Sequence, residues 1–432
     1  MVTVLITEQR GQGLKMSSEC YWDSDTDCYA NETIVTDSFI FMKLLSVVLF
    51  KLLIISTFCV IEDWDPDQFR DAKQLIISRG FVAEEHKVVT PDGYILTLQH
   101  IINPYVPKRK LKKTLLLTHG ILASSTDWLM NNHGLAFVLS QFGYDVWLAN
   151  CRGTTYSKGH IYLDHKTDPR YWMFTLDNIA LYDIPTMIKY VLKYTSRKKI
   201  SYICHSQGCT VMFALLSAKS KYSKILTEFI ALAPVVFDTN TYGAPLRLLS
   251  PLQFALRAAP MGLLPPIPIQ LQLQGFICRD KTLRYLCGVL LGLVTGLNAQ
   301  KTAYERLGAF ASHFPTGVSS WVVAHFLQWS ASSRFAKFDY GLQQNLIKYG
   351  QTYPPEYPLK SIRLPTISIF YSLNDAISEY RNVKMIKRYL TVPLYSENLI
   401  MDHKWGHFDY FAAKTVGYNI NVKIIDLLQS TE

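Results

Sequence analysis

The sequence predicts an α/β fold in which a mostly parallel central sheet carries helices on both faces, with a mainly helical segment inserted into it. Three observations support this prediction. Short apolar runs rich in β-branched residues alternate with helical stretches, an order typical of a parallel sheet. One of these runs turns directly into an apolar helix at Ser206. The alternation stops at residue 237 and resumes near residue 360, so the intervening stretch is expected to lie outside the sheet.

The N-terminal region is read as two segments that precede the fold. Residues 1–41 are polar, acidic and without hydrophobic periodicity, and we interpret them as a disordered or non-native upstream extension. Residues 42–60 combine a basic start, an apolar run and small residues, which is typical of a signal peptide beginning at Met42. If Met1 is the start, the same run would be a signal anchor, although its two lysines make it a poor membrane span. A buried core helix is the third interpretation.

The core is assigned to residues 61–236 and 360–432. Its expected elements, in chain order, are a helix within 64–80, a hairpin over 87–98 that turns at Asp92-Gly93, strands at 114–118 and 145–149, a helix over 181–194, a strand from 200 that leads into a helix over 211–216, strands at 366–371 and 397–401, and a last helix near 417–429. The parallel strands need helical crossovers between them, and the helical stretches supply these.

Residues 237–359 break this alternation. The stretch is apolar and interrupted by proline and glycine, and aromatic residues such as Trp321 and Trp329 recur at helical spacing. We interpret it as a helical cap that includes a lid.

The sequence Cys204-His205-Ser206-Gln207-Gly208 joins a strand to a helix. A serine at such a turn is the nucleophile elbow of the α/β-hydrolases, which holds the hydroxyl clear of the sheet where a histidine can take its proton. Cys204 stands where the usual motif has its first glycine, and it adds a Cβ and a sulfur where strand and helix meet. From this motif alone, Ser206 can equally be an ordinary serine in a connection.

An acid and a base are expected in the order serine, acid, histidine. The acid should follow the strand that ends near Tyr371, where Asp375 lies, although this residue can also serve as a turn or cap residue. Glu379 is the rival acid. The histidine should lie between the last strand and the last helix, where His403 and His407 are the two candidates.

Five blocks resemble the acid lipases, the family of the gastric and lysosomal lipases, in the same order along the chain: His119–Trp128, Gly143–Gly153, His205–Gly208, Tyr353–Tyr357 and His407–Phe411. The resemblance extends over roughly residues 62 to 430, and several blocks are long enough to be specific.

The resemblance implies roles for several of these residues. His407 in Gly-His-Phe-Asp matches the lipase pattern, while His403 between two charged residues is expected at the surface. The oxyanion hole is implied to consist of the backbone N–H groups of Ile121 and Gln207, the second of which also follows from the elbow itself. His119 and Gly120 are expected to shape the loop, and His205 to be structural.

The cysteines are expected to fall into two classes. The family pattern implies a disulfide between Cys278 and Cys287 within the cap, and a secreted protein would keep it oxidised. Cys151, Cys204 and Cys209 are expected to be buried free thiols.

The resemblance implies a secreted or lumenal serine hydrolase that cleaves triglycerides or steryl esters at a lipid–water interface through an acyl-enzyme intermediate. We expect a monomer with transient membrane or lipid-droplet contact, and neither a cofactor nor a metal ion. No nucleic-acid partner is expected, because the net charge of +10 is scattered and no such motif occurs.

Two other functions remain open from the sequence. Cys204 in the elbow and the lack of a glycosylation sequon after the signal depart from the family pattern, and they leave open a catalytically weak or inactive lipid-binding protein. An esterase for small soluble esters is disfavoured because so large an apolar cap suits long acyl chains.

Overall fold

The computed structural model describes residues 65–237, 248–280, 282–295 and 303–431. The predicted extension and the predicted signal peptide, or signal anchor, lie outside these residues. Within them, none of the helices combines the length and the apolar character needed to span a bilayer.

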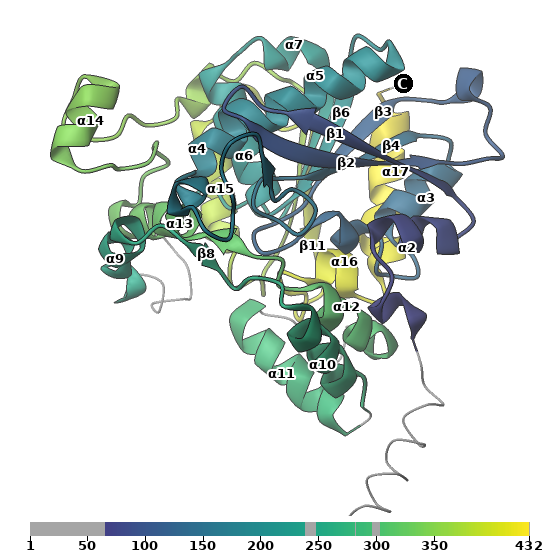
Figure 1. The fold of residues 1–432 in the computed structure, drawn as a ribbon. Helices are drawn as coiled ribbons and strands as arrows, with labels where there is room; N and C mark the ends of the chain where they lie inside the picture. The colour runs from purple at the N-terminus through teal and green to yellow at the C-terminus, as the bar shows by residue number, and fades with distance from the viewer. Residues whose placement is uncertain (1–64, 238–247, 281, 296–302, 432) are drawn as a thin grey trace, which may run out of the picture. The chain divides into compact units, whose positions relative to one another are not determined.

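A central sheet runs through the molecule (Figure 1). Its strands are β1 (Val82–Val89), β2 (Tyr94–Ile102), β3 (Thr114–Thr118), β4 (Asp145–Asn150), β5 (Gly159–His160), β6 (Ile200–His205), β7 (Leu226–Leu232), β10 (Ile367–Ser372) and β11 (Ser396–Ile400). The order across the sheet is β1-β2-β4-β3-β6-β7-β10-β11, with β5 paired to β2. The pairs made by β2 are antiparallel, and those from β4 to β11 are parallel. The predicted fold class is confirmed.

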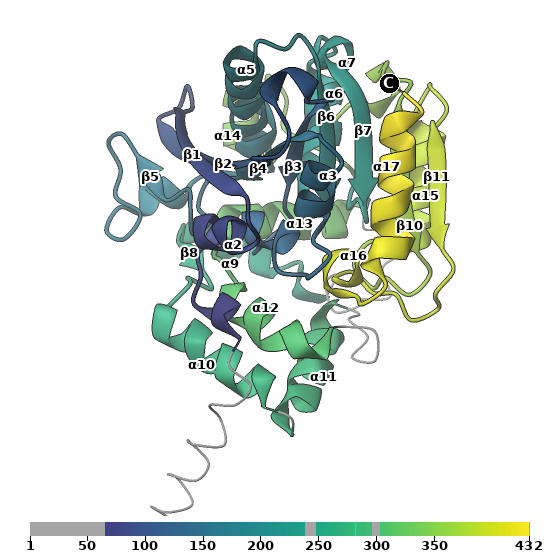
Figure 2. The same cartoon turned by 90° about the vertical axis from the view of Figure 1, so that its right-hand side faces the viewer.

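Helices cover both faces of the sheet (Figures 1 and 2). They are α2 (Ala72–Ser78), α3 (Leu135–Gln141), α4 (Leu176–Asn178), α5 (Ile184–Thr195), α6 (Gln207–Ala218), α7 (Tyr222–Ile225), α15 (Tyr380–Tyr389), α16 (Asp409–Ala412) and α17 (Val422–Gln429). Alternate residues of a strand point to opposite faces of the sheet, so each strand contributes side chains to the hydrophobic core on both faces. Tyr202 of β6 belongs to the core under α5, α6 and α15, whereas its neighbour Ile203 belongs to the core under α2, α3 and α17.

Most predicted elements lie where the sequence placed them. The hairpin turn at Asp92-Gly93 separates β1 from β2, and β3 has its predicted bounds. The two predicted helices over 181–194 and 417–429 each begin as a π-helical turn, Ile179–Asp183 and Gly417–Asn421, before α5 and α17. The core elements that were not predicted are β5, β7, α3, α4, α7, α15 and α16.

Between β7 and β10 the described chain adds no strand to the central sheet. It forms α9 (Leu252–Ala258), α10 (Pro268–Arg279), α11 (Leu283–Thr295), α12 (Leu307–His313), α13 (Ser320–Ser332) and α14 (Leu342–Tyr349), with a separate two-stranded ribbon of β8 (Gly262–Leu263) and β9 (Val318–Ser319). Both views place α10, α11 and α12 together beside α16. The predicted boundaries of core and cap stay predictions.

A buried ion network joins the β1–β2 turn to the loop after β4 and to the start of α5. The guanidinium of Arg152 is fully buried and donates to Asp183 at 2.7 Å and to Asp92 at 2.6 Å. It also lies over the ring of Tyr94, 3.9 Å from its centroid. Asp183 is fully buried as well, so its charge depends on Arg152 for compensation.

We expect Arg152→Met to lower the free energy of unfolding by about 3–5 kcal/mol, because it leaves the carboxylate of Asp183 buried without its cation. The matched control is Arg170→Met, which removes an exposed arginine from Asp168 and should change stability by about 0–1 kcal/mol. Urea titration of both variants measures the difference, and an equally small loss in both would contradict the structural role of Arg152.

Candidate active site

Ser206 is the single residue between β6 and α6, and its backbone has an unusual conformation. Its φ is 52° and its ψ is −119°, a region that residues with a side chain rarely occupy. The turn is held by the Ser206 N–H, which donates to the carbonyl of Leu232 at 3.0 Å. A Cβ on Gly208 would lie 2.6 Å from the carbonyl oxygen of Thr118, so only glycine allows α6 to approach β3 this closely.

Three of the predicted residues meet in one hydrogen-bonded row. His407 Nε2 lies 2.8 Å from Ser206 Oγ, and His407 Nδ1 lies 3.0 and 2.9 Å from the two carboxylate oxygens of Asp375. All three residues are buried. Because a carboxylate only accepts, His407 Nδ1 carries the proton, and its Nε2 then presents a lone pair to the serine hydroxyl.

The structure separates the favoured acid and histidine from their rivals. Asp375 follows β10, and its Oδ1 also accepts from the backbone N–H groups of Ile377 and Ser378 at 2.9 and 2.7 Å. Glu379 instead caps the N-terminus of α15 and lies outside the row. His403 is exposed at the surface of the loop that carries His407.

The two predicted oxyanion donors belong to two segments that meet near this turn. Gln207 is the first residue of α6, so its N–H has no acceptor within the helix. Ile121 belongs to the loop after β3, which passes close to the elbow: a Cβ on Gly120 would lie 3.2 Å from Ser206 Cβ. The roles of both N–H groups stay predictions.

Two buried histidines support this site without belonging to the row. Burial lowers the pKa of His119 to about 4, and the neutral ring donates to the Gly120 carbonyl at 2.7 Å and accepts from the Cys151 N–H at 3.2 Å. Burial lowers the pKa of His205 well below its usual range, and its Nε2 lies 2.9 Å from the carbonyl oxygen of His407. The ring of His205 therefore holds the backbone of His407, a specific contact that the sequence did not predict.

The prediction that Cys204 and Cys209 are free thiols was wrong. The structure joins them in a disulfide, with 5.2 Å between their Cα atoms, whereas Cys151 is a buried free thiol. Cys204 lies near the end of β6 and Cys209 in the first turn of α6, so the disulfide closes a loop around Ser206. The sulfur of Cys204 is thus bonded across the turn, where a glycine was expected.

A cavity of about 490 Å³ lies among α10, α11, α12 and the loop that carries His407. Its walls include Leu122, next to the predicted oxyanion residue Ile121, and Phe408, next to His407. The disulfide between Cys278 and Cys287, present as the family resemblance implies, links α10 to α11 along one wall. The lining is largely apolar, which suits a hydrocarbon chain.

Comparison with known proteins gives matches along the chain. A model of a partial α/β-hydrolase lipase region matches residues 72–132, and one of the α/β hydrolase fold matches 113–255. A model of the Tctex-1 family matches residues 1–48, outside the described part. Among solved structures, a thermophilic esterase from Thermogutta terrifontis is 16% identical, covering 81% of this chain and 99% of its own, with a TM-score of 0.45.

Curated relatives are more similar. Gastric triacylglycerol lipase of Bos taurus is 31% identical over 371 residues, which cover 84% of this chain and 92% of the relative. Lysosomal acid lipase/cholesteryl ester hydrolase of Homo sapiens is 32% identical over 378 residues, with the same coverage of both chains. Lipase member K of Homo sapiens is 31% identical over 373 residues, again covering 92% of the relative. Since such relatives align with this chain along almost their whole length, the chain belongs to the acid lipase family of α/β-hydrolases.

Proposed function

We propose that this carboxylic ester hydrolase is a secreted or lumenal lipase that cleaves long-chain lipid esters through an acyl-enzyme on Ser206. The observation that carries the proposal is the hydrogen-bonded row of Ser206, His407 and Asp375 close to an apolar cavity. Its relatives are named for triacylglycerol and cholesteryl ester substrates, and both are long-chain esters.

The proposed reaction proceeds in two halves. Ser206 Oγ attacks the ester carbonyl while His407 Nε2 takes its proton, and Asp375 stabilises the imidazolium that forms. The N–H groups of Ile121 and Gln207 bind the oxyanion. His407 then protonates the departing alcohol and leaves an acyl group on Ser206. Water attacks this ester, again losing its proton to His407, and the fatty acid leaves as Ser206 recovers its proton.

The cap supplies both an acyl-chain pocket and a surface for a lipid interface. Its helices expose large apolar side chains, among them Phe254 at 61%, Ile269 at 76% and Leu286 at 56%. Apolar groups presented in this way favour contact with lipid. We infer that the chain works as a monomer at such an interface, with the cap including a lid.

Two disulfides support a secretory route, because disulfides persist in oxidising compartments and are rare in the cytosol. A signal peptide over residues 42–60 would deliver the chain there, and a signal anchor from Met1 is the alternative. Secretion and delivery to lysosomes both fit this chemistry.

We expect His407→Ala to lower kcat for a soluble short-chain ester by roughly four to six orders of magnitude, because the proton on Ser206 then has no acceptor. Asp375→Asn should lower kcat by about four orders of magnitude, since an amide favours the wrong tautomer of His407. Steady-state kinetics measure both losses.

The matched controls are His403→Ala and Glu379→Gln, which remove the rival histidine and the rival acid. Each should leave kcat within about threefold of the wild type. A loss in His403→Ala that exceeds the loss in His407→Ala would contradict the proposed base, and the corresponding reversal for Glu379 would contradict the proposed acid.

We expect Gln274→Trp to reduce turnover of a palmitoyl ester by about tenfold or more while butyryl ester turnover stays within about twofold, because the indole would occupy the cavity between α10 and α12. Gln272→Trp is the control, since it places the same side chain at an exposed position of α10. Equal losses on both esters in Gln274→Trp would argue against this cavity as the acyl-chain pocket.

An inactive lipid-binding protein remains the second candidate, and Cys204 is the observation that favours it. The disulfide from Cys204 to Cys209 argues against this candidate. A lone sulfur would crowd the turn, whereas a disulfide ties β6 to α6 around Ser206. Such a cross-link restricts the turn that presents the nucleophile, which favours catalysis.

We expect the double variant Cys204→Ala/Cys209→Ala to lose about 2 kcal/mol of stability, as a six-residue loop predicts, and to fall severalfold in kcat. Urea titration and kinetics on a short soluble ester measure the two effects. The control is Cys278→Ala/Cys287→Ala, which removes the cap disulfide and should leave kcat on that ester nearly unchanged. A large gain in kcat in the first variant would instead support the inactive candidate.

A further inference from the structure

We propose that Glu84, His86 and His100 form a binding site for a zinc-like divalent metal ion at the outer edge of the central sheet. This site is independent of the ester hydrolysis proposed above, because it lies on the β1–β2 hairpin and not at the turn that carries Ser206.

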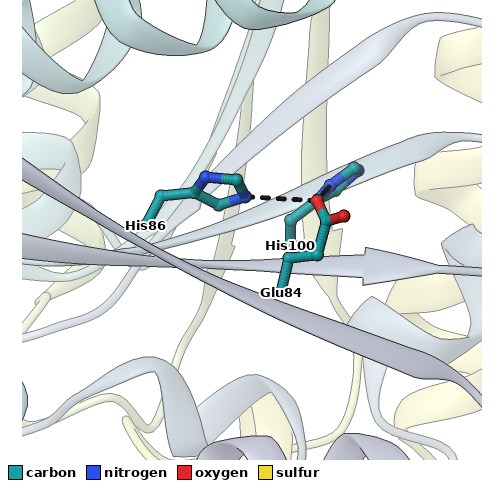
Figure 3. A group of neighbouring side chains, drawn as sticks. All are labelled: Glu84, His86 and His100. Carbon is teal, nitrogen blue, oxygen red and sulfur yellow. Dashed lines mark hydrogen bonds and ion pairs between the residues drawn. The ribbon is translucent and has the colours of Figure 1, made fainter.

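The pairing of β1 and β2 brings the three side chains together. Glu84 and His86 are two residues apart in β1 and therefore point to the same face of the sheet. His100 is the direct antiparallel partner of Glu84 in β2. Figure 3 shows both imidazole rings turned toward the carboxylate of Glu84. No sequence motif indicated this group, because sixteen positions separate Glu84 from His100.

The distances fit a tetrahedral metal ion. Glu84 Oε2 lies 3.3 Å from His86 Nε2 and 3.1 Å from His100 Nδ1, and one ligand atom from each residue lies within 4.8 Å of the others. Zinc binds nitrogen and carboxylate oxygen at about 2.0–2.2 Å, which separates neighbouring ligand atoms by about 3.3 Å in a tetrahedron. The carboxylate oxygen already stands at nearly this spacing from both nitrogens, and the two nitrogens lie within 4.8 Å of each other.

In each histidine, the ring nitrogen that points away from Glu84 also has a hydrogen-bond partner. His86 Nδ1 lies 2.9 Å from the hydroxyl of Tyr190, and His100 Nε2 lies 2.7 Å from a carboxylate oxygen of Asp145. Metal-binding histidines are usually oriented through the second nitrogen by such partners, a carboxylate in particular. Both rings therefore direct the remaining nitrogen at Glu84.

The contacts of His100 favour a cation at this position. Its ring lies between two carboxylates, Asp145 on one nitrogen and Glu84 on the other. A neutral imidazole has one N–H and can donate to only one of them. The other contact then places a ring lone pair against a carboxylate oxygen, unless a cation lies between them. A metal ion supplies that charge, and a second proton on the ring is the competing explanation.

The site is accessible from solvent. Glu84 and His100 line a cavity of about 250 Å³, and the Glu84 side chain is 38% exposed, so water can complete the coordination sphere. Lys108 and Arg197 line the same cavity and oppose cation binding, while Tyr194 donates a hydrogen bond to Glu84 Oε2 at 2.9 Å. The carboxylates of Glu84 and Asp145 offset these two cations. Three protein ligands with an opposing charge nearby indicate a site of moderate affinity.

The expected role is structural. The ion would tie β1 to β2 at the end of the sheet, four strands away from β6. A ligand that binds only the folded chain stabilises it by an amount that grows with the logarithm of its concentration over its Kd. Zinc should therefore raise the melting temperature and leave ester hydrolysis unchanged.

The test is isothermal titration of the full chain with ZnCl₂, together with visible absorption after addition of CoCl₂. We expect one ion per chain, a rise in Tm, and the intense visible bands of tetrahedral cobalt. Glu84→Gln and His86→Gln should each weaken zinc binding by about tenfold or more and abolish the cobalt bands. Both residues are partly exposed, and circular dichroism establishes that the variants fold.

His403→Gln is the matched control, because it removes an exposed histidine from another part of the surface. It should leave the affinity and the cobalt bands unchanged. Zinc binding that is equally strong in Glu84→Gln, in His86→Gln and in the wild type would overturn the proposal. So would the absence of saturable binding in the wild type.

Discussion

The close approach of α6 to the end of β3 is the constraint on which the site depends. A side chain at Gly208 would collide with the carbonyl oxygens of Thr118 and His119, so the first turn of α6 can approach β3 this closely only with a glycine at this position. This contact places the loop after β3 against the elbow and turns Ser206 toward the loops that follow β10 and β11. Parallel strands present their C-terminal ends at one edge, which is why Asp375 and His407 meet Ser206 there.

Much of this arrangement could be predicted from the sequence because its causes are local or follow the chain order. The apolar strand before Ser206 and the apolar helix after it indicate the elbow by themselves. Asp375 and His407 lie in the loops that follow β10 and β11, two strands whose patterns are also clear. Geometry was needed only to decide against Glu379, which caps a helix, and His403, which is exposed.

The features that could not be predicted depend on contacts between distant segments. His205 contacts the backbone of His407, 202 positions away, and no pattern in either segment indicates this. The group around Glu84 requires the exact register of β1 on β2. The Cys204–Cys209 disulfide is a different case, because five positions separate the two residues. The turn between β6 and α6 brings the two sulfurs together, and this pairing was not considered from the sequence.

The central claim is that the strand-to-helix turn presents Ser206 as the nucleophile. Incubation of the folded chain with a fluorophosphonate probe, followed by peptide mapping, tests it most directly. The account predicts one modified serine per chain, Ser206, with no modification once the chain is unfolded, because reactivity requires His407 at 2.8 Å. Modification of a different serine, or none in a folded chain, would contradict it.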